Sequence, residues 1–581
     1  MQLSMHLPIS FPKEAYEYGR RSSGEIHGVV LTKPHMVELI LDLAGYAQDR
    51  DLARMRLLEP ACGHGAFLVP AIGRLMTAAK AARVKPDKLA DCVRAFDIDE
   101  EHVAITHAAV VETLRLHGAD DKTAARLAQT WVRQGDFLLA PAQGTFDAVV
   151  GNPPYIRIEQ IAPALQAEYH ARYQSIYDRA DLYVAFIERG LDLLGPRGVL
   201  AFVCADRWTL NRYGAPLRRL VAEKYHVQSY VDLHQASPSE SEVSAYPAIF
   251  SIGRQSTGPV MVARMATGAP AECEAIRAAV RGGRRHGADT VEFCPTWFEG
   301  DAPWIVTSPE QSETLRLLQT KFAPIEHGGL AHVGIGVATG CDQVFIVGKD
   351  ADIESERLVP LVMRDDIERG HIRDAGRFVI NTFRDEGGLV DLHDYPKLAR
   401  YLKAHAPAIR KRHVAKKAPA SWFRTIDRVY PKLVGTPKLL IPDIAGANEV
   451  VFDQGRFHPH HNLYFVTSDH WDLEVLGGLL SSRVALFFVW SYAVKMRGGY
   501  LRFQAQYLRR IRLPPPEGLP APLCAKIKKA FRSRVFANLD GLSLQAYGLA
   551  ELPAFDFVDT RGRQRGDPHR PGAQTPLMTT W

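Results

Sequence analysis

Residues 56–78 read RLLEPACGHGAFLVPAIGRLMTA, which predicts a short strand at 56–58, a glycine-rich turn and an apolar helix over 67–78. Glycines in the turn supply φ > 0 and allow the backbone to come close to a ligand. The following helix adds the positive end of its dipole to the same turn. The pattern indicates either a ligand site or a plain strand-to-helix turn, and both interpretations stay open at this point.

The residues of the turn narrow the class of ligand. They match neither the G-x-G-x-x-G fingerprint nor the Gly-Lys-Ser/Thr ending of a P-loop, so a phosphate site of those types is not indicated. Glu59 comes directly before the turn, and an acid there suits a cationic ligand. S-adenosylmethionine carries both an ammonium and a sulfonium group, and it meets that requirement.

Strands and helices alternate along residues 31–231. A helix is expected after Thr32, starting at Pro34, and another over 181–194; further strands are expected at 93–98, near 135, at 146–150 and at 199–203. This alternation predicts the α/β class, with a mostly parallel sheet that has helices on both faces. Ligands of such sheets bind at the carboxyl ends of the strands, and every chemically suggestive cluster here follows a strand.

Acidic clusters follow the second and third strands. Asp97 ends the second strand, where a carboxylate typically hydrogen-bonds ribose hydroxyls. Asp99 is better interpreted as a helix N-cap. After the third strand, Asp136 offers an acceptor for an adenine amino group and Phe137 a ring to stack on the base. A simple turn explains this third cluster equally well when it is taken alone.

The most specific motif is Asn152-Pro153-Pro154-Tyr155, directly after the strand at 146–150. Proline fixes φ and favours an extended backbone in the residue before it, so the Asn152 side chain and the Pro153 carbonyl are held rigidly. Their two oxygens match the two hydrogens of an exocyclic NH2 group. Accepting both hydrogens pulls the amine nitrogen toward tetrahedral geometry and makes it more reactive. A structural turn is the alternative, and the functional interpretation is favoured over it.

Bulk properties place the chain among ordinary globular proteins. Its 581 residues favour two or three domains, and its net charge of +6 fits a polyanion-binding face without proving one.

Seven scattered cysteines include no Cys-x-x-Cys pair, so no disulfide framework and no metal site are expected, and the cytoplasm is the simplest compartment. The apolar stretch 473–494 is interrupted by polar residues, which predicts a buried helix and no membrane association.

Together these motifs resemble the gamma-class adenine-N6 DNA methyltransferases of bacterial restriction–modification systems. The resemblance covers about 25–250 strongly, with cofactor motifs first and the catalytic motif next; a target recognition domain follows. It rests on Thr32/Pro34, EPACGHG at 59–65, FDID at 96–99, GDFL at 135–138, NPPY at 152–155 and DLYVAFIE at 181–188. Looser matches follow at 334–340, 437–438 and 498–500.

The resemblance implies a Rossmann-like class I methyltransferase domain that uses S-adenosylmethionine and acts on double-stranded DNA. Asn152 and Pro153 would bind the target amine, and Tyr155 would stack on the flipped base. The cofactor residues that it implies are Thr32, Glu59, Ala61, Gly63, Gly65, Asp97, Ile98, Asp136, Phe137 and Pro154. The family usually has a second aromatic residue after the strand that ends near Asp232; this chain has His234 there, with Tyr246 and Phe250 only later, so that residue is unassigned.

The expected organisation is an N-terminal extension at 1–22, the methyltransferase domain at 23–256, a linker or insertion at 257–301, an α+β target recognition domain at 302–552 and a disordered tail at 553–581. The second domain concentrates basic residues beside aromatic ones, which favours a DNA-facing surface. The candidate DNA-binding residues are Arg410, Lys411, Arg412, Lys416, Lys417, Arg497 and Tyr500.

Other functions remain as alternatives at this stage. Methyltransferases that act on RNA or on a protein glutamine share Asn-Pro-Pro-Tyr, but the basic second domain weighs against them. A fused nuclease is not expected, since the first methyltransferase motif begins near Gly24. The intact catalytic motif argues against a DNA-binding protein without activity. Cytosine-N4 chemistry stays open, as does a partner such as a separately encoded restriction endonuclease or defence-system subunits.

Overall fold

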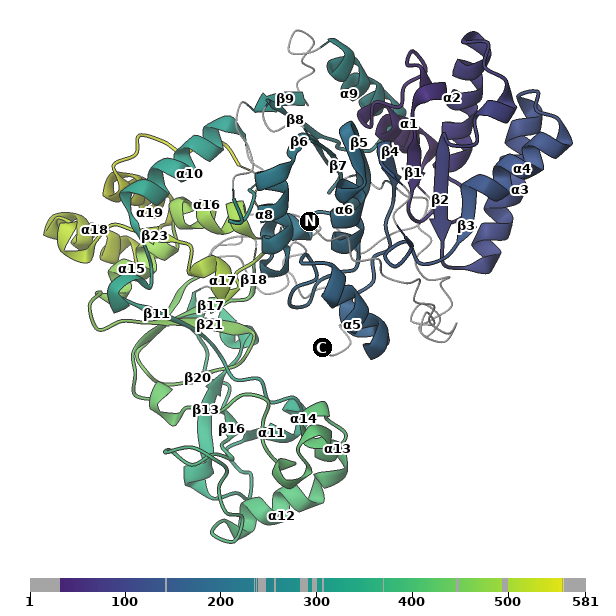
Figure 1. Ribbon diagram of the computed structural model, residues 1–581. Helices are drawn as coiled ribbons and strands as arrows, with labels where there is room; N and C mark the ends of the chain where they lie inside the picture. The colour runs from purple at the N-terminus through teal and green to yellow at the C-terminus, as the bar shows by residue number, and fades with distance from the viewer. Residues whose placement is uncertain are drawn as a thin grey trace. The chain divides into compact units, whose positions relative to one another are not determined.

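The computed structural model divides the chain into two compact units, unit 1 (Met1–Ile305) and unit 2 (Val306–Trp581) (Figure 1). Each unit is described by itself. The structure describes residues 32–141, 144–234, 236, 238, 247–254, 258–282, 291–294, 300–305, 308–368, 370–445, 449–493, 500–555 and 557.

Unit 1 is built on a nine-stranded sheet in the order β3-β2-β1-β4-β5-β7-β6-β8-β9. Strands β1 to β5 pair in parallel, β7 is antiparallel to both neighbours, and β8 returns parallel to β6. The strands are β1 (Leu57–Glu59), β2 (Val93–Asp97), β3 (Val132–Gln134), β4 (Phe146–Gly151), β5 (Leu194–Ala205), β6 (His226–Asp232), β7 (Pro247–Gly253), β8 (Val260–Arg264) and β9 (Val291–Cys294). The predicted α/β class with a mostly parallel sheet is confirmed, and the sheet is of the Rossmann-like kind.

Helices of unit 1 cover both faces of this sheet. One buried cluster joins apolar residues of α1, α2, α3, α4 and α9 to alternate residues of the strands, including Ala148 and Val150 of β4. On the other face α6 approaches so closely that a Cβ added at Gly190 would lie 2.6 Å from Leu200 Cδ1. The helices are α1 (Pro34–Leu43), α2 (Leu68–Ala81), α3 (Glu100–Leu116), α4 (Asp121–Trp131), α5 (Pro163–Arg172), α6 (Tyr183–Asp192), α7 (Arg207–Leu210), α8 (Ala215–Lys224) and α9 (Pro270–Gly282).

The stretch 257–301 differs from the predicted linker or insertion. It contains β8, α9 and β9, which extend the central sheet beyond β6 and bury Ile276 and Ala279 of α9 in the core that α1 also lines. The apolar run of β8 is short and lies between glycine-containing stretches, so its local pattern resembles a linker. Pairing with β6 makes it a strand, and local sequence does not show that pairing.

Unit 2 combines small sheets with helices, the α+β arrangement expected of it. Its two four-stranded sheets have the orders β11-β21-β17-β19 and β12-β16-β13-β20. Their strands are β11 (His332–Ile335), β12 (Ile346–Gly348), β13 (Leu358–Val362), β16 (Arg377–Ile380), β17 (Lys438–Pro442), β19 (Val451–Asp453), β20 (His458–Pro459) and β21 (Leu463–Thr467). The short pairs are β10 (Ala323–Pro324) with β23 (Arg512–Leu513), β14 (Ile367–Glu368) with β15 (His371–Ile372), and β18 (Ile444–Ala445) with β22 (Leu501–Arg502).

The apolar stretch 473–494 forms two helices where one was predicted. The break falls between α15 and α16, where Ser482 caps α16 by accepting a hydrogen bond from Ala485 N. No single helix among the described residues is long and apolar enough to span a membrane; α15 and α16 meet that test only as a pair, bent by 58°, and their apolar side chains are buried. The helices of unit 2 are α10 (Pro309–Lys321), α11 (Asp342–Phe345), α12 (Pro396–Ala404), α13 (Ala406–Arg410), α14 (His413–Lys417), α15 (Leu473–Leu480), α16 (Arg483–Tyr492), α17 (Ala505–Leu508), α18 (Ala521–Arg532) and α19 (Phe536–Tyr547).

Candidate active site

The glycine turn after β1 is tied to the end of β2. Gly63 N donates to Asp97 Oδ2 at 2.8 Å, and Thr106 Oγ1 of α3 donates to Gly63 O at 2.6 Å. Gly63 and Gly65 have φ of 49° and 83°, a region that side chains other than glycine rarely adopt. Because β1 and β2 are parallel neighbours, Ala61 and Ile98 follow strand ends at the same edge of the sheet. The predicted cofactor turn is therefore a preformed backbone loop beside Asp97.

Asp97 also organises the segment that follows β2. Its Oδ1 accepts a hydrogen bond from Asp99 N at 2.9 Å and lies 3.3 Å from His102 Nδ1. The hydrogen bond to Asp97 raises the pKa of His102. Asp99 accepts from Glu101 N at 2.8 Å and so caps α3, as its sequence position suggested. Asp97 thus holds two successive loops together, with Oδ2 engaged only by Gly63 among the hydrogen bonds of the described residues.

Glu59 is a buried acid with an unmet hydrogen-bonding requirement. Its side chain is 1% exposed, and Oε2 has no hydrogen-bond partner among the described residues. Burial raises its pKa well above the usual range, and the negative charge of Asp97 adds to the effect. A buried polar atom without a partner is costly, so a cationic group that binds here would relieve that cost. This atom is an observed feature of the turn that fits the ammonium or sulfonium of S-adenosylmethionine.

Asp136 and Phe137 follow β3 at the same edge. Asp136 Oδ2 accepts from Tyr169 OH at 2.7 Å, Oδ1 accepts from Leu138 N at 2.8 Å, and burial raises its pKa. Phe137 is only 3% exposed, and its ring centroid lies 5.4 Å from that of Phe186 in α6. The carboxylate keeps acceptor capacity for an adenine amine, whereas the Phe137 ring is largely enclosed by protein.

The last residue of β4, directly before Asn152, is at a position that favours glycine. Gly151 has φ of 152°, and a Cβ there would lie 3.6 Å from Pro60 Cδ of the glycine turn. Asn152 Nδ2 then donates to Thr32 Oγ1 at 3.4 Å, although the two residues are 120 positions apart in the sequence. This bond uses the amide nitrogen, so the Asn152 oxygen is the group suited to accept from a substrate amine. The structure brings Thr32, the glycine turn and the Asn-Pro-Pro motif together.

Tyr155 presents an aromatic ring next to this amide. The ring is partly exposed, and its centroid lies 6.2 Å from that of Tyr183 in α6, at an interplanar angle of 51°. Burial raises the pKa of Tyr155 well above its usual range, so the phenol is neutral. Pro153 is buried and Pro154 is half-buried. Tyr155 therefore carries an uncharged ring that contacts α6.

A further cluster at the ends of β5 and β6 was missed from the sequence. Asp206 Oδ2 lies 2.7 Å from His234 Nε2 and accepts from Tyr230 OH at 3.1 Å. Asp232 Oδ1 accepts from His234 N at 2.8 Å. An acid directly after the apolar run of β5 is the same signal that identified Asp97, and it could have been used here. His234 occupies the chain position of the unassigned second aromatic residue; Tyr246 lies outside the described residues and Phe250 is buried inside β7.

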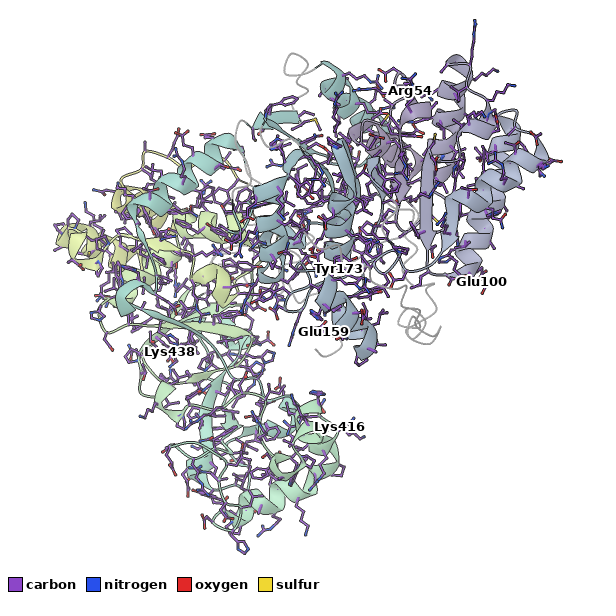
Figure 2. The ribbon with its side chains drawn as sticks, in the orientation of Figure 1. Arg54, Glu100, Glu159, Tyr173, Lys416 and Lys438 are labelled. Atoms are coloured by element: carbon purple, nitrogen blue, oxygen red, sulfur yellow. The ribbon has the colours of Figure 1, made fainter. Side chains whose placement is uncertain are left out.

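The candidate DNA-binding residues of unit 2 have different surroundings. Lys411, Lys416 and Lys417 are exposed, and Lys416 extends from the surface in Figure 2. Arg410 is exposed, with its guanidinium 4.5 Å above the Trp422 ring. These four cations are available to a polyanion.

Arg412 has a structural role that differs from the predicted phosphate contact. Its guanidinium donates to three backbone carbonyl oxygens, those of Thr339 at 2.8 Å, Trp422 at 2.9 Å and Arg424 at 2.8 Å. Burial lowers its pKa. Tyr500 is half-buried, and Arg497 lies outside the described residues.

Known proteins are similar to most of this chain. The profile of the Eco57I restriction-modification methylase family matches residues 88–238. The Type II methyltransferase M.PaeR7I of Pseudomonas aeruginosa is 46% identical over 90% of this chain and 92% of its own length. The Type II methyltransferase M.XhoI of Xanthomonas vasicola is 44% identical over 92% of this chain and 99% of its own length.

Among solved structures, the Type IIL restriction-modification enzyme MmeI in complex with DNA matches with a TM-score of 0.58 at 13% identity, over 89% of this chain and 75% of that one. That likeness concerns the fold. The identity and coverage of the two bacterial relatives show the family to which the chain belongs. The motifs at the sheet edge are consistent with that family. The chain belongs to the Type II methyltransferases of restriction–modification systems.

Proposed function

We propose that this protein transfers a methyl group from S-adenosylmethionine to the N6 amino group of an adenine that is rotated out of duplex DNA. The observation that carries the proposal is the placement of Asn152, held by Thr32, at the same sheet edge as the acid-lined glycine turn. Family membership supports a modification enzyme, and the Asn-Pro-Pro-Tyr motif supports an amine as the group that is methylated.

The target amine would be held by two oxygens. Asn152 uses its amide nitrogen to donate to Thr32, so Oδ1 is the atom that would accept a hydrogen of the target amine. Pro153 O would accept the second hydrogen, because the proline fixes that carbonyl. Rotating a base out of the duplex costs a few kcal/mol. Stacking on Tyr155 would offset about 1–3 kcal/mol of that cost.

The cofactor would be held by the ends of β1, β2 and β3. Bound S-adenosylmethionine would supply an electrophilic methyl group on its sulfonium. Glu59 Oε2 would meet a cationic group, which supplies the partner that this buried oxygen lacks among the described residues. Asp97 retains acceptor capacity on Oδ2 for a ribose hydroxyl, and Asp136 retains it for the adenine amine. Positioning alone then accounts for catalysis, since the proposed transfer needs no covalent enzyme intermediate.

Unit 2 would provide the DNA contacts that are independent of the catalytic motif. Arg410, Lys411, Lys416 and Lys417 are exposed and would contact phosphates. Arg412 is not part of this set, because its donors are engaged by backbone carbonyls. As a modification enzyme the protein would act alongside a separately encoded restriction endonuclease.

The decisive experiment expresses the chain in a host free of DNA methylation and maps modified bases by single-molecule sequencing. We expect N6-methyladenine within one short motif, and its loss in Asn152→Ala. Calorimetry should show that Asn152→Ala still binds S-adenosylmethionine, because the variant removes the target-amine contact and one hydrogen bond to Thr32 but leaves every proposed cofactor residue in the chain. Gln160→Ala, a change of an exposed amide in the same unit, is the control that should keep methylation. Finding no modified base, or only N4-methylcytosine, would refute the adenine assignment.

A further inference from the structure

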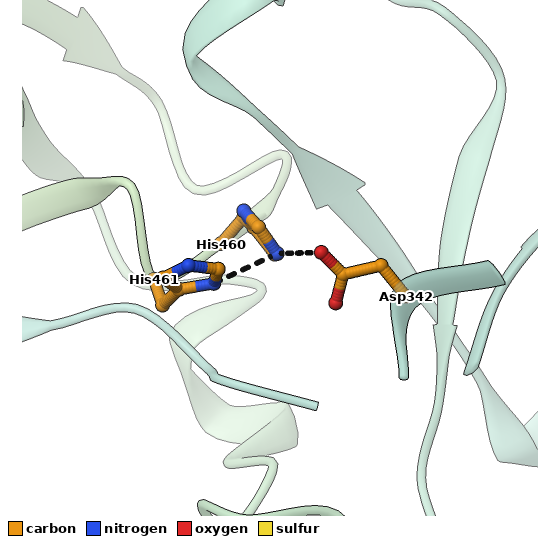
Figure 3. Close-up of side chains that lie close together, drawn as sticks. All are labelled: Asp342, His460 and His461. Carbon is orange, nitrogen blue, oxygen red and sulfur yellow. Dashed lines mark hydrogen bonds and ion pairs between the residues drawn. The ribbon is translucent and has the colours of Figure 1, made fainter. Parts of the chain in front are cut away.

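Unit 2 contains a group of three ligating side chains that the proposed methyl transfer does not use. Asp342 is the first residue of α11, and His460 and His461 follow β20 directly. The three side chains converge (Figure 3). His460 Nε2 lies 3.1 Å from Asp342 Oδ2 and 3.0 Å from His461 Nδ1. All three ligand atoms lie within 4.8 Å of one another.

Hydrogen bonds alone satisfy this arrangement poorly. A neutral imidazole nitrogen has either one hydrogen or one lone pair. With a hydrogen on Nε2, His460 has to share it between Asp342 and His461. With a lone pair on Nε2, His460 can accept from His461 but faces the negative oxygen of Asp342. A cation at the centre lets all three atoms use lone pairs at once.

The separations between these atoms fit a metal ion. Zinc binds imidazole nitrogen and carboxylate oxygen at about 2.0–2.2 Å. If the ligand–zinc–ligand angle lies between the values for square and for tetrahedral coordination, the two ligand atoms are roughly 2.9–3.4 Å apart. The two separations that involve His460 Nε2, 3.1 Å to Asp342 Oδ2 and 3.0 Å to His461 Nδ1, fall within this range. Two imidazoles with one carboxylate suit zinc and related transition metals, whereas Mg²⁺ and Ca²⁺ prefer oxygen ligands.

The backbone holds the ligands in place independently of any ion. Val337 N donates to Pro459 O at 2.9 Å, and His461 N donates to Val337 O at 3.0 Å. A Cβ at Gly336 would lie 2.2 Å from His460 O, so only glycine permits this close approach of the segments that follow β11 and β20. Thr339 Oγ1 donates to Asp342 Oδ1, which orients the carboxylate as outer hydrogen bonds do in metal sites.

The site has one buried and one open side. The His460 side chain is 2% exposed, the Asp342 side chain is 42% exposed, and His461 is exposed. The three side chains therefore lie at the surface of unit 2, with only His460 enclosed. An ion there would have positions for water in addition to its three protein ligands.

We propose that Asp342, His460 and His461 bind a divalent transition-metal ion, with Zn²⁺ the best match. The ion fastens the start of α11 to the turn between β20 and β21, two segments that are 118 positions apart in the sequence. This site differs from the expectation of no metal, which rested on cysteine spacing. It requires neither S-adenosylmethionine nor DNA, so its test is separate from that of the methyl transfer.

The test uses the full-length protein without a polyhistidine tag, loaded with Zn²⁺ and then dialysed against metal-free buffer. Plasma mass spectrometry should find about one zinc per chain in the wild type and less than about a tenth of that in His461→Gln and in Asp342→Asn. His461 and Asp342 are not fully buried, so these changes should leave the circular dichroism spectrum unaltered. His393→Gln changes an exposed histidine elsewhere in unit 2 and should retain the zinc.

A second measurement uses Co²⁺ as a spectroscopic probe and the thermal midpoint as a stability readout. Wild type should develop visible cobalt absorption and a higher Tm with Zn²⁺, and His461→Gln should show neither. The proposal is overturned if the wild type retains no zinc after dialysis. It is equally overturned if His461→Gln retains as much zinc as the wild type, or if His393→Gln loses it.

Discussion

Asp97 uses both carboxylate oxygens to hold backbone N–H groups, one in the glycine turn and one at the start of the loop to α3. Hydrogen bonds to a charged group contribute more than neutral ones, because the ion strengthens the electrostatic attraction. The shape of the candidate cofactor site therefore depends strongly on this side chain, together with the bond from Thr106 to Gly63. Asp99, only two residues away, makes a cap that is local to α3.

We expect Asp97→Ala to weaken S-adenosylmethionine binding by about 10–100-fold, the effect of losing one or more charge-assisted hydrogen bonds. Isothermal titration calorimetry measures the change. Asp99→Ala should instead cost about 1 kcal/mol of stability through the lost cap and leave cofactor affinity unaltered. Equal cofactor affinity in wild type and Asp97→Ala would contradict the role given to this carboxylate.

His458 makes the stability of unit 2 depend on pH. It is buried at 1% exposure, Nδ1 donates to Pro459 O at 2.9 Å, and Nε2 accepts from Tyr430 N at 3.3 Å. Burial lowers its pKa from 6.5 to about 4. The unfolded chain therefore takes up the proton first, so the stabilisation is complete above pH 6.5 and is lost as the pH falls toward 4.

The expected loss over that range is roughly 3 kcal/mol, measured by urea unfolding at a series of pH values. His458→Gln removes the titrating ring and should flatten the dependence. His393→Gln, a change at the surface of the same unit, should preserve it. This account is wrong if the free energy of unfolding of the wild type falls no more between pH 6.5 and 4 than that of His458→Gln does.

At the scale of elements, local pattern predicted the strands well where their ends carry chemistry. The expected strands 93–98 and 146–150 agree with β2 and β4 to within one residue, because Asp97 and Gly151 end them. The expected strand 199–203 is shorter than β5, which starts at Leu194. Glycine and proline near residue 195 suggest a turn, but the structure continues the pairing with β4 through a register shift. That irregularity depends on the neighbouring strand.

Gly190 allows α6 to lie close to the sheet. A Cβ there would lie 2.6 Å from Leu200 Cδ1 and 3.3 Å from Val149 Cγ1. We therefore expect Gly190→Ala to destabilise the protein by about 1–3 kcal/mol, as overpacking does. Gly73→Ala in α2 is the matched control, since its Cβ meets only His117 at 3.8 Å. That change should stabilise unit 1 by about 0.5–1 kcal/mol through helix propensity.

Chemical denaturation of both variants measures these opposite shifts. If Gly190→Ala were as stable as Gly73→Ala, the close approach of α6 to Leu200 would not be a packing constraint. The same experiment reports on the site, because α6 also carries Tyr183 against Tyr155. A displaced α6 would move the ring on which the base is proposed to stack.

At the scale of the whole molecule, most features that the sequence did not predict are assembled from distant segments; the Asp206 cluster is the exception, since its local signal could have been used. The strand-end motifs are short and local, so Glu59, Asp97 and Asn152 could be proposed as site candidates from the residues alone. The group of Asp342, His460 and His461 depends on two backbone segments that meet only in the fold. The same reason explains Arg412, whose carbonyl partner Thr339 is 73 positions away. Charge and spacing identify a basic side chain but not the acceptor it has in the folded chain.

The buried carboxyl of Glu59 has a consequence for how unit 1 takes up a positively charged molecule. Because its pKa is raised, the group retains its proton to a higher pH than an ordinary glutamic acid does. A cation that binds beside it favours the ionised form and so releases that proton to solvent. Over the pH range in which the Glu59 carboxyl of the ligand-free protein is protonated, ligand uptake is an exchange of one positive charge for another. Alkaline conditions therefore favour the ligand-bound state.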